Sequence, residues 1–362
     1  MKILYVITGL SLGGAEKQVC QLADSFSSIG HDVLVISLIS NVEVRPTNPN
    51  IKVITLDLTK NPTSLFKALI KFCREMKVFT PDVVHSHMVH ANLFCRLSRL
   101  FYRMPKLITS AHSNFEGGGW RTFAYRYTDR LSDLTTNVSE DAVRTFIDIK
   151  AVPENKIEVV YNGVCDKRFK SSATDRKAIR ARLGISDDTH LILSVGRLEK
   201  AKDFPSLLYA FSNIQKSLPN TKLAIIGKGS LKNELLSIAR KSSISDNVIF
   251  VGAIDSTNMW YSAADLFVSS SAWEGFGLVL AEAMLHGLPV VATDSGGSRE
   301  VIGSFGPIVP VGNSEALSVA ITDSLRKILL DTDVIKSSRR NFIQKKFSAN
   351  TIQKKWLELY LR

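Results

Sequence analysis

The sequence predicts an α/β protein built from two doubly wound domains that face a central cleft. Short apolar runs alternate with longer amphipathic stretches in both halves of the chain, which is the pattern of parallel βαβ units. Several of these runs lead into glycine-rich turns, as strands do before a helix that binds an anion. The 362 residues exceed the size at which one hydrophobic core usually stops growing. We therefore expect two Rossmann-like domains, with ligands near the carboxyl ends of their strands.

The individual elements follow from the positions of the runs. In the first half, the pattern predicts helices over 16–29 and 64–77, and strands over 3–8, 33–38, 53–56, 83–85 and 107–110. In the second half it predicts strands, with helices between them, over 190–195, 222–226, 248–251, 266–268 and 289–292.

The domain boundary is expected at the turn dipeptide Asn162-Gly163, which leads into a charged stretch. This gives an N-terminal domain over 1–163 and a C-terminal domain over 164–347. The tail 348–362 carries apolar residues at helical spacing, and we expect this amphipathic helix to join the first domain through Ile352, Trp356, Leu359 and Tyr360.

Composition limits the class of protein. No run approaches the roughly 20 apolar residues of a membrane span. The N-terminal run has one basic residue and no small-residue cleavage site, so it predicts a first strand and a cytosolic protein. Four scattered cysteines, without C-x-x-C spacing, predict neither a disulfide nor a metal site.

The net charge of +12 favours anionic partners, which include nucleic acid, anionic lipid and phosphorylated substrates. The basic residues are dispersed and no nucleic-acid motif is present, so we expect no nucleic-acid partner. A nicotinamide site is also disfavoured, because the loop after the first strand lacks G-x-G-x-x-G spacing.

A glycine-rich turn that runs into a small-residue helix carries the strongest functional signal. Gly275 and Gly277 permit close ligand approach, and the first N–H groups of the following helix suit a phosphate. Glu274 falls on the turn and Glu282 about one turn into the helix, so each offers carboxylate oxygens to hydroxyl groups. Phosphate and hydroxyls together predict a sugar-nucleotide site. Two solvated carboxylates on an ordinary helix are the alternative.

Two cations leave the end of another strand in a short loop. Arg197 can hold phosphate oxygens with two parallel hydrogen bonds, and Lys202 adds a mobile charge. Together they predict neutralisation of a diphosphate leaving group without a metal; the alternative is a pair of solvated surface charges.

Two further motifs could suggest a metal-binding site. Asp331-Thr332-Asp333 follows a helix-like stretch, which predicts a helix-end motif, not a metal-binding Asp-x-Asp. His85 and His87 share one side of a strand end and His90 starts a helix, with no cysteine or carboxylate close by, so we expect no metal site.

His112 follows a first-domain strand and is expected to face the cleft, where a neutral imidazole can bind a sugar hydroxyl. The glycines at 117–119 predict a mobile acceptor loop next to it.

With these residues in place, nearly the whole chain resembles the retaining GT-B glycosyltransferases of family 4, which carry an E-x7-E signature. The resemblance is carried by the motifs Gly13-Gly14-Ala15-Glu16, His112, Tyr161-Asn162-Gly163-Val164, Val195-Gly196-Arg197-Leu198 with Lys202, Gly227-Lys228-Gly229, Glu274-Gly275-Phe276-Gly277, Glu282-Ala283 and Gly287-Leu288-Pro289-Val290-Val291-Ala292. Ser113 departs from the acidic residue or glycine that is frequent after the histidine, which leaves the acceptor side open.

The resemblance implies a role for each of these residues. Glu282 would hold the ribose hydroxyls and Glu274 the transferred sugar. The diphosphate would contact Arg197 and Lys202, and the donor nucleotide sugar would also lie against Gly14, Val251, Ile254, Gly275, Phe276, Gly277, Leu278 and Val279. His112 would touch the sugar. The reaction would retain anomeric configuration, and it would need no metal or other cofactor.

The resemblance further implies a UDP-linked hexose or N-acetylhexosamine as donor and a polyprenyl-diphosphate-linked saccharide as acceptor, in synthesis of O-antigen, capsule or a related bacterial polysaccharide. A peripheral position on the cytoplasmic face of the inner membrane would suit such an acceptor. Two basic faces suit contact with anionic lipid: Arg96, Arg99 and Arg103 on one helix, and Lys67, Lys71 and Arg74 on another. Ordinary solvated helix surfaces are the alternative. A hydrolase or epimerase of the same fold is the rival activity, for which the loop after His112 offers only Glu116.

Overall fold

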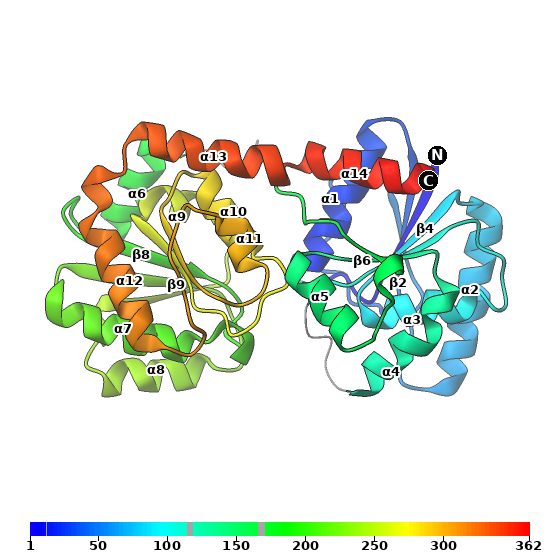
Figure 1. Cartoon of the computed structure of the whole chain (residues 1–362), viewed down its shortest axis with the longest axis horizontal. Coiled ribbons are helices and arrows are strands. Elements are labelled where there is room, and N and C mark those ends of the chain that lie inside the picture. Colours follow the sequence, from blue (N-terminus) through cyan, green and yellow to red (C-terminus); the bar gives the residue numbers. More distant parts are fainter. Residues whose placement is uncertain (12, 114–118, 166–170) are drawn as a thin grey trace. The chain divides into compact units, whose positions relative to one another are not determined.

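A computed structural model describes residues 1–11, 13–113, 119–165 and 171–362, and it divides the chain into two compact units (Figure 1). Unit 1 comprises Met1–Gly163 and Ala349–Arg362, and unit 2 comprises Val164–Ser348. Each unit is a parallel sheet with helices on both faces, so the predicted α/β class with two doubly wound domains is confirmed (Figure 1).

Within the described residues, the sheet of unit 1 has seven strands in the order β3-β2-β1-β4-β5-β6-β7, all parallel. The strands are β1 (Lys2–Ile7), β2 (Asp32–Ser37), β3 (Lys52–Thr55), β4 (Val83–His87), β5 (Leu107–Ser110), β6 (Leu134–Asn137) and β7 (Ile157–Val159). The chain adds β2 and β3 on one side of β1 and then returns to place β4 on the other. This reversal between β1 and β4 is the topological switch point of unit 1.

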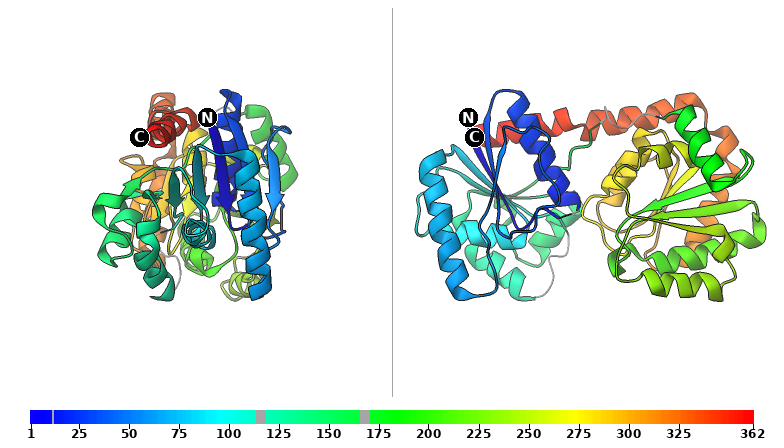
Figure 2. Two further views of the ribbon diagram at one scale, coloured as in Figure 1. Left: turned by 90° about the vertical axis from the view of Figure 1, so that its right-hand side faces the viewer. Right: turned by 180° about the vertical axis from the view of Figure 1, so that it is seen from behind.

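The helices of unit 1 are α1 (Gly14–Ser28), α2 (Pro62–Phe79), α3 (Val89–Ser98), α4 (Gly119–Thr128), α5 (Glu140–Asp148) and α14 (Ala349–Leu361). The last of these packs beside α1, and both chain termini lie in unit 1 (Figure 2). Ile352, Trp356, Leu359 and Tyr360 are the apolar face predicted for the tail. They are buried in one core cluster with Ile3 and Tyr5 of β1.

The junction between the units is held on the unit 1 side by a glutamine of α1. Gln18 donates from Nε2 to the carbonyl oxygen of Gly163 at 2.6 Å and accepts from the Gly163 N–H at 2.9 Å. A Cβ on Gly163 would lie 3.2 Å from the Cα of Ala349, so a glycine at this position lets the backbone pass close to the start of α14.

Unit 2 repeats the architecture, and its described part has a six-stranded parallel sheet in the order β10-β9-β8-β11-β12-β13. The strands are β8 (His190–Val195), β9 (Thr221–Ile226), β10 (Val248–Gly252), β11 (Leu266–Ser269), β12 (Val290–Thr293) and β13 (Ile308–Val309). The helices are α6 (Ala173–Leu183), α7 (Phe204–Ser217), α8 (Lys232–Lys241), α9 (Asn258–Ala263), α10 (Leu278–Leu285), α11 (Ser298–Ile302), α12 (Ser314–Arg326) and α13 (Asp333–Phe347). Here the switch point lies between β8 and β11.

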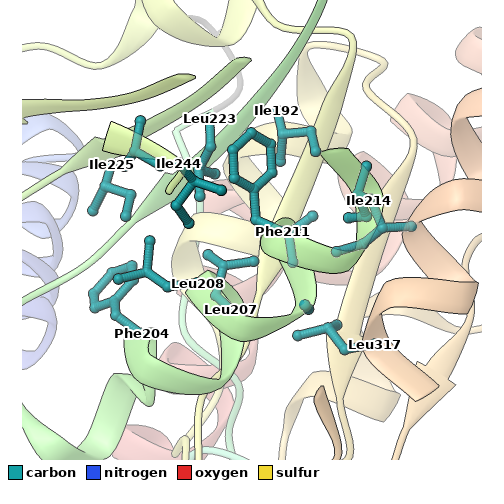
Figure 3. Close-up of a cluster of buried hydrophobic side chains, with 14 of the residues drawn as sticks. Ile192, Phe204, Leu207, Leu208, Phe211, Ile214, Leu223, Ile225, Ile244 and Leu317 are labelled. Atoms are coloured by element: carbon teal, nitrogen blue, oxygen red, sulfur yellow. The ribbon is translucent and has the colours of Figure 1, made fainter. Parts of the chain in front are cut away.

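The core of unit 2 fixes the sheet that carries these strand ends. Phe204, Leu207, Phe211 and Ile214 of α7 are buried against strand residues, and Leu317 of α12 closes the cluster (Figure 3). Their spacing places them on one face of α7, which is the amphipathic pattern of a helix packed on a sheet.

The prediction of a lipid-facing basic surface formed by Arg96, Arg99 and Arg103 is wrong. α3 ends at Ser98, so Arg103 lies beyond the helix. Arg96 is fully buried and forms an ion pair with Asp129 at 3.0 Å, and it donates to Thr135 Oγ1 at 2.7 Å. Arg99 pairs with Asp133 at 2.8 Å. Arg96 and Arg99 therefore serve the fold of unit 1 and not a lipid surface, because their charges already have partners inside the unit.

No helix among the described residues is both long and apolar enough to cross a membrane.

Candidate active site

The polar residues of unit 2 gather at the carboxyl ends of its two central strands. Arg197 and Lys202 follow β8, while Glu274 follows β11, and these strands are neighbours at the switch point. Open parallel sheets bind ligands at this position, because the loops there diverge and leave room above the strand ends.

Two glycines let the loop after β9 pack closely against the loop after β8. A Cβ on Gly227 would lie 1.8 Å from the Gly196 carbonyl oxygen, and one on Gly229 would lie 2.3 Å from the Leu198 carbonyl oxygen. Backbone hydrogen bonds Gly196 N to Ile226 O and Leu198 N to Lys228 O join the two loops at 2.9 and 3.0 Å. The Gly227-Lys228-Gly229 motif thus fixes the backbone on both sides of Arg197, whose side chain is exposed.

Lys202 and Glu274 form an ion pair at the switch point, between Nζ and Oε2. The Lys202 stem lies over Gly196, where a Cβ would be 3.1 Å from its methylene carbons. The two loops are also joined by their backbones, because Ala272 N donates to Ala201 O at 2.9 Å and Ser270 Oγ donates to Lys202 O at 2.8 Å.

A buried serine, which the sequence analysis did not single out, also holds Glu274. Ser271 is 1% exposed and its hydroxyl donates to Glu274 Oε2 at 3.3 Å. The Ser271 carbonyl oxygen accepts from Thr293 Oγ1 at 2.6 Å, which ties this loop to the end of β12. The run of serines before Glu274 was the available signal, since short hydroxyl side chains commonly bond to neighbouring loop atoms.

The predicted turn and helix follow Glu274. Gly277 has φ +95°, which favours glycine, and it is the N-cap of α10 without a side-chain cap. The ring of Phe276 is buried against Phe347, with centroids 5.1 Å apart. The N–H groups of Leu278 and Val279, in the first turn of α10, have no acceptor one turn back within the helix, so they suit an anion.

Glu282 lies in the second turn of α10 and is half-buried. The buried hydroxyl of Tyr261 donates to Glu282 Oε2 at 2.9 Å. Val251 and Ile254 lie in and just beyond β10, the outermost strand on the β9 side of the sheet, where Ile254 is exposed. The carboxyl edge of the unit 2 sheet therefore carries two cations after β8, the Glu274 carboxylate after β11, and then the N-terminus of α10 with the Glu282 carboxylate in its second turn.

In unit 1, the predicted residues follow β1, at the switch point, and β5, the next strand beyond β4. Gly14 begins α1 after β1 and is exposed, and His112 follows β5. His112 Nε2 lies 3.0 Å from Nδ1 of His87, which ends β4, so one nitrogen donates to the other. Glu116, Gly117 and Gly118 lie outside the described residues, and α4 begins at Gly119.

Three histidines of unit 1, the buried His85 and His87 and the half-buried His112, form a cluster. The rings of His85 and His87 are tilted to each other with centroids 4.0 Å apart, and the nitrogens of His85 hydrogen-bond to the hydroxyls of Tyr360 and Ser110, each at 2.7 Å. Burial lowers the pKa of His112 to about 4. It also lowers the pKa of His85 and His87 well below the ordinary value. All three imidazoles are therefore neutral near pH 7.

The described residues hold no group of three or more His, Cys, Asp or Glu side chains placed to bind a metal ion. The Asp331-Thr332-Asp333 motif is a helix-end motif, as predicted: the Thr332 hydroxyl caps α13 by accepting from Ile335 N, and Asp331 pairs with the buried Arg339.

Comparison with known proteins adds an independent line of evidence. The family model described as "Glycosyltransferase Family 4" matches residues 12–168, and the model described as "Glycosyl transferases group 1" matches residues 175–346. The two matches fall on the two units in turn.

Individual relatives agree with these matches. The chain is 25% identical over 94% of its length to the N-acetylgalactosamine-N,N'-diacetylbacillosaminyl-diphospho-undecaprenol 4-alpha-N-acetylgalactosaminyltransferase of Campylobacter jejuni, of which the alignment covers 93%. It is 24% identical over 97% of its length to the N-acetyl-alpha-D-glucosaminyl L-malate synthase of Bacillus anthracis, with 94% of that protein covered. An alignment with a glycosyltransferase of Methanocaldococcus jannaschii, at 32% identity, spans 61% of this chain and 60% of that protein.

Among solved structures, the Anabaena protein Alr3699/HepE in complex with UDP superposes with a TM-score of 0.86 at 22% identity, over 99% of both chains. The fold and the matched relatives define this protein as a glycosyltransferase with the GT-B fold. The model of glycosyltransferase family 4 covers most of unit 1 and the model of the group 1 glycosyl transferases covers most of unit 2, and both describe glycosyltransferases.

Proposed function

We propose that this enzyme transfers a hexose or N-acetylhexosamine from a UDP-sugar to a lipid-linked saccharide, with retention of configuration and without a metal ion. The observation that carries the proposal is the arrangement at the switch point of unit 2. Lys202, Glu274 and the N-terminus of α10 follow one another along the carboxyl edge, with Glu282 one turn further. Such an edge offers cations and N–H groups to a diphosphate, and carboxylates to the hydroxyls on either side of it.

Each group then has a definite task. The diphosphate binds between Arg197, Lys202 and the N–H groups of Leu278 and Val279. Charge that develops on the leaving UDP is neutralised by side chains that the loop packing already holds in place. Glu274, held by Lys202 and Ser271, contacts the transferred sugar.

The reaction breaks the bond between the anomeric carbon and the diphosphate oxygen. The acceptor hydroxyl oxygen forms a new bond to the same face of that carbon, and its proton passes to the departing phosphate oxygen. Glu274 is committed to an ion pair with Lys202, which makes it a poor nucleophile, so the carboxylate positions the sugar instead of attacking it. His112, neutral at working pH, donates or accepts one hydrogen bond to the sugar.

UDP as the nucleotide and a polyprenyl-diphosphate saccharide as acceptor are supported by relatives. The Anabaena structure contains UDP, and the Campylobacter relative is named for a diphospho-undecaprenol acceptor. An acceptor of this kind places the enzyme at the cytoplasmic face of a membrane, in synthesis of a surface polysaccharide.

The outer face of α2, formed by Phe66, Lys67, Ile70, Arg74 and Lys77, is the surface that suits a membrane. Phe66 and Ile70 are 66% and 55% exposed, and the three basic residues are exposed beside them. Lys71, also predicted for this face, is half-exposed and pairs with Asp57 at 3.3 Å. Apolar side chains mixed with cations favour the interface of an anionic bilayer.

The function is tested with purified enzyme, a panel of UDP-sugars and GDP-mannose, and a polyprenyl-diphosphate disaccharide in detergent, with nucleotide release and product configuration as readouts. UDP release is expected to depend on the acceptor, to persist in EDTA and to yield an α-linked product from an α-linked donor. Free sugar without acceptor would identify a hydrolase, and an epimerised UDP-sugar an epimerase. Activity lost in EDTA and restored by Mn²⁺ would contradict the metal-free mechanism.

A further inference from the structure

Tyr261 of α9 approaches the proposed nucleotide site from beneath α10. Its side chain is fully buried, and its hydroxyl donates to Glu282 Oε2 at 2.9 Å. The same hydroxyl lies 3.4 Å from the carbonyl oxygen of Val279. A buried phenol that bonds to a half-buried carboxylate fixes the rotation of that carboxylate, because turning it away would leave the hydroxyl without its charged acceptor.

The surroundings of Tyr261 leave the ring little freedom. Its centroid lies 5.0 Å from that of His286 and 5.8 Å from that of Phe267. His286 Nδ1 lies 3.1 Å from the Glu282 carbonyl oxygen, and only a protonated Nδ1 can donate there. Two neighbouring rings, those of Tyr261 and His286, thus hold the side chain and the backbone of Glu282 respectively.

The hydroxyl can act as a donor at all pH values at which the enzyme works. Burial raises the pKa of Tyr261 well above 10, and the neighbouring Glu282 carboxylate raises it further. The phenol therefore stays protonated, and its proton points to an anion, which is the stronger kind of hydrogen bond.

We propose that Tyr261 is a positioning residue that holds the Glu282 carboxylate in the orientation needed to bind both vicinal hydroxyls of the ribose, and that it thereby sets the preference of the site for ribonucleotides over 2′-deoxyribonucleotides. The inference rests on the proposed function, in which Glu282 binds the ribose. A carboxylate in one fixed orientation can bond two adjacent hydroxyls at once, whereas a rotating one gains little from the second.

The test compares the Kd of UDP with that of 2′-deoxy-UDP by calorimetry for wild type and Tyr261→Phe, which removes a single oxygen atom. The wild type is expected to prefer UDP. The variant is expected to bind UDP about tenfold more weakly, and 2′-deoxy-UDP with little change, so that the preference largely disappears. kcat at saturating donor is expected to stay within about twofold, since only ground-state positioning is lost. Tyr209→Phe, which removes an exposed phenol from α7, is the matched control and should leave the preference unchanged.

A second variant, Glu282→Asp, tests the same contact in case the Tyr261→Phe protein does not fold. Glu282→Asp draws the carboxylate back from the phenol by one methylene, so it should also lose the preference, and combining the two substitutions should add little further loss. A preference for UDP that survives both single substitutions would overturn the role of Tyr261. If Glu282→Ala leaves UDP affinity unchanged, the ribose assignment in the proposed function fails. If Glu282→Ala weakens UDP binding while the preference survives in Tyr261→Phe, the present inference fails alone.

Discussion

At the scale of single residues, the two glutamates of the E-x7-E spacing differ in what holds them. Glu274 is bound by a cation and a serine hydroxyl, on a loop that lies over the strand ends. Glu282 lies in a regular helix, α10, and its carboxylate accepts a hydrogen bond from the phenol of Tyr261. In the proposed function, the first pair links the sugar side of the site to the diphosphate side through Lys202, while the second involves only the nucleotide. The two carboxylates should therefore affect different kinetic constants.

Glu274→Gln, which keeps the shape but removes the charge, is expected to lower kcat by about 100-fold with little change in the KM for donor, because the charge balance around Lys202 matters most as UDP leaves. Glu282→Ala is expected to raise the KM for donor by about tenfold or more, because a hydrogen bond to a charged group is lost. Steady-state kinetics with varied UDP-sugar measure both. Glu234→Gln, on the exposed face of α8, is the control. Equal effects of the two substitutions on kcat would contradict this division.

The buried histidines of unit 1 make stability depend on pH. His112 has its pKa lowered from 6.5 to about 4 by burial, and His85 and His87 shift in the same direction. The folded state thus holds neutral imidazoles that the unfolded state protonates below about pH 6.5. This contribution is fully present above pH 6.5 and is lost as the pH falls towards 4. Each such histidine gives a slope of up to about 1.4 kcal/mol per pH unit.

His87→Gln is expected to flatten that slope in urea titrations between pH 6.5 and 4.5. His190→Gln, which removes an imidazole at the start of β8 in unit 2, serves as the comparison. The slope is compared, not the absolute stability, so that a general loss of packing in the variant does not affect the result. An unchanged slope in His87→Gln would show that the pKa of this imidazole is the same in the folded and unfolded states.

At the scale of secondary structure elements, α2, α3 and β6 show what the sequence could and could not predict. Its amphipathic spacing predicts both the helix and its outer basic face. The same argument fails for Arg96, because helical spacing does not reveal that Asp129, far along the chain, provides a buried partner. The strand β6 was missed for a related reason. Its Thr135 and Thr136 are buried yet polar, and they are satisfied by hydroxyls on β5, so no apolar run marks the strand.

The residues of the candidate site also divide into those that the sequence could predict and those that it could not. The glycines, Glu274, Glu282 and Lys202 lie in local motifs, so they could be predicted as site residues from the sequence. Ser271 lies close to Glu274 in sequence, but its role depends on the side-chain rotamer. Tyr261 lies in a separate helix, and it meets Glu282 only because α9 and α10 flank the same strand, β11. Residues that act through another side chain are fixed by packing, for which a single sequence has no local signature.

The outer face of α2 predicts binding to anionic vesicles. Replacing Lys67 and Arg74 together by Gln is expected to weaken binding to vesicles with anionic lipid by about tenfold or more, since each basic residue near such a surface contributes about 1 kcal/mol. Binding to neutral vesicles should be weak for both proteins, and co-sedimentation measures the difference. A variant with Leu329→Ser and Val334→Ser, which removes exposed apolar side chains from unit 2, is the control and should bind as the wild type does. If that variant loses binding instead, the membrane surface lies on unit 2.

At the scale of the whole molecule, the tasks are divided between the two units. Residues proposed to bind the nucleotide and diphosphate, from Arg197 to Glu282, belong to unit 2, whereas Gly14 and His112 belong to unit 1. The predicted cleft between the units stays a prediction, and it has a consequence in solution. UDP alone should engage unit 2, while an intact UDP-sugar should also engage the loop and the histidine of unit 1.

Hydrogen exchange with mass spectrometry distinguishes these two states. UDP is expected to slow amide exchange in the loop after β8 and in the first turn of α10, because bound phosphate oxygens accept from those N–H groups and hold the loops closed. A UDP-sugar is expected to add slower exchange at the start of α1 and around His112. In Lys202→Met the effect of UDP at α10 should shrink, while Lys200→Met, in the same short 3-10 helix, should respond as the wild type does. Slower exchange in unit 1 with UDP alone would mean that the nucleotide, and not the sugar, brings unit 1 to the site.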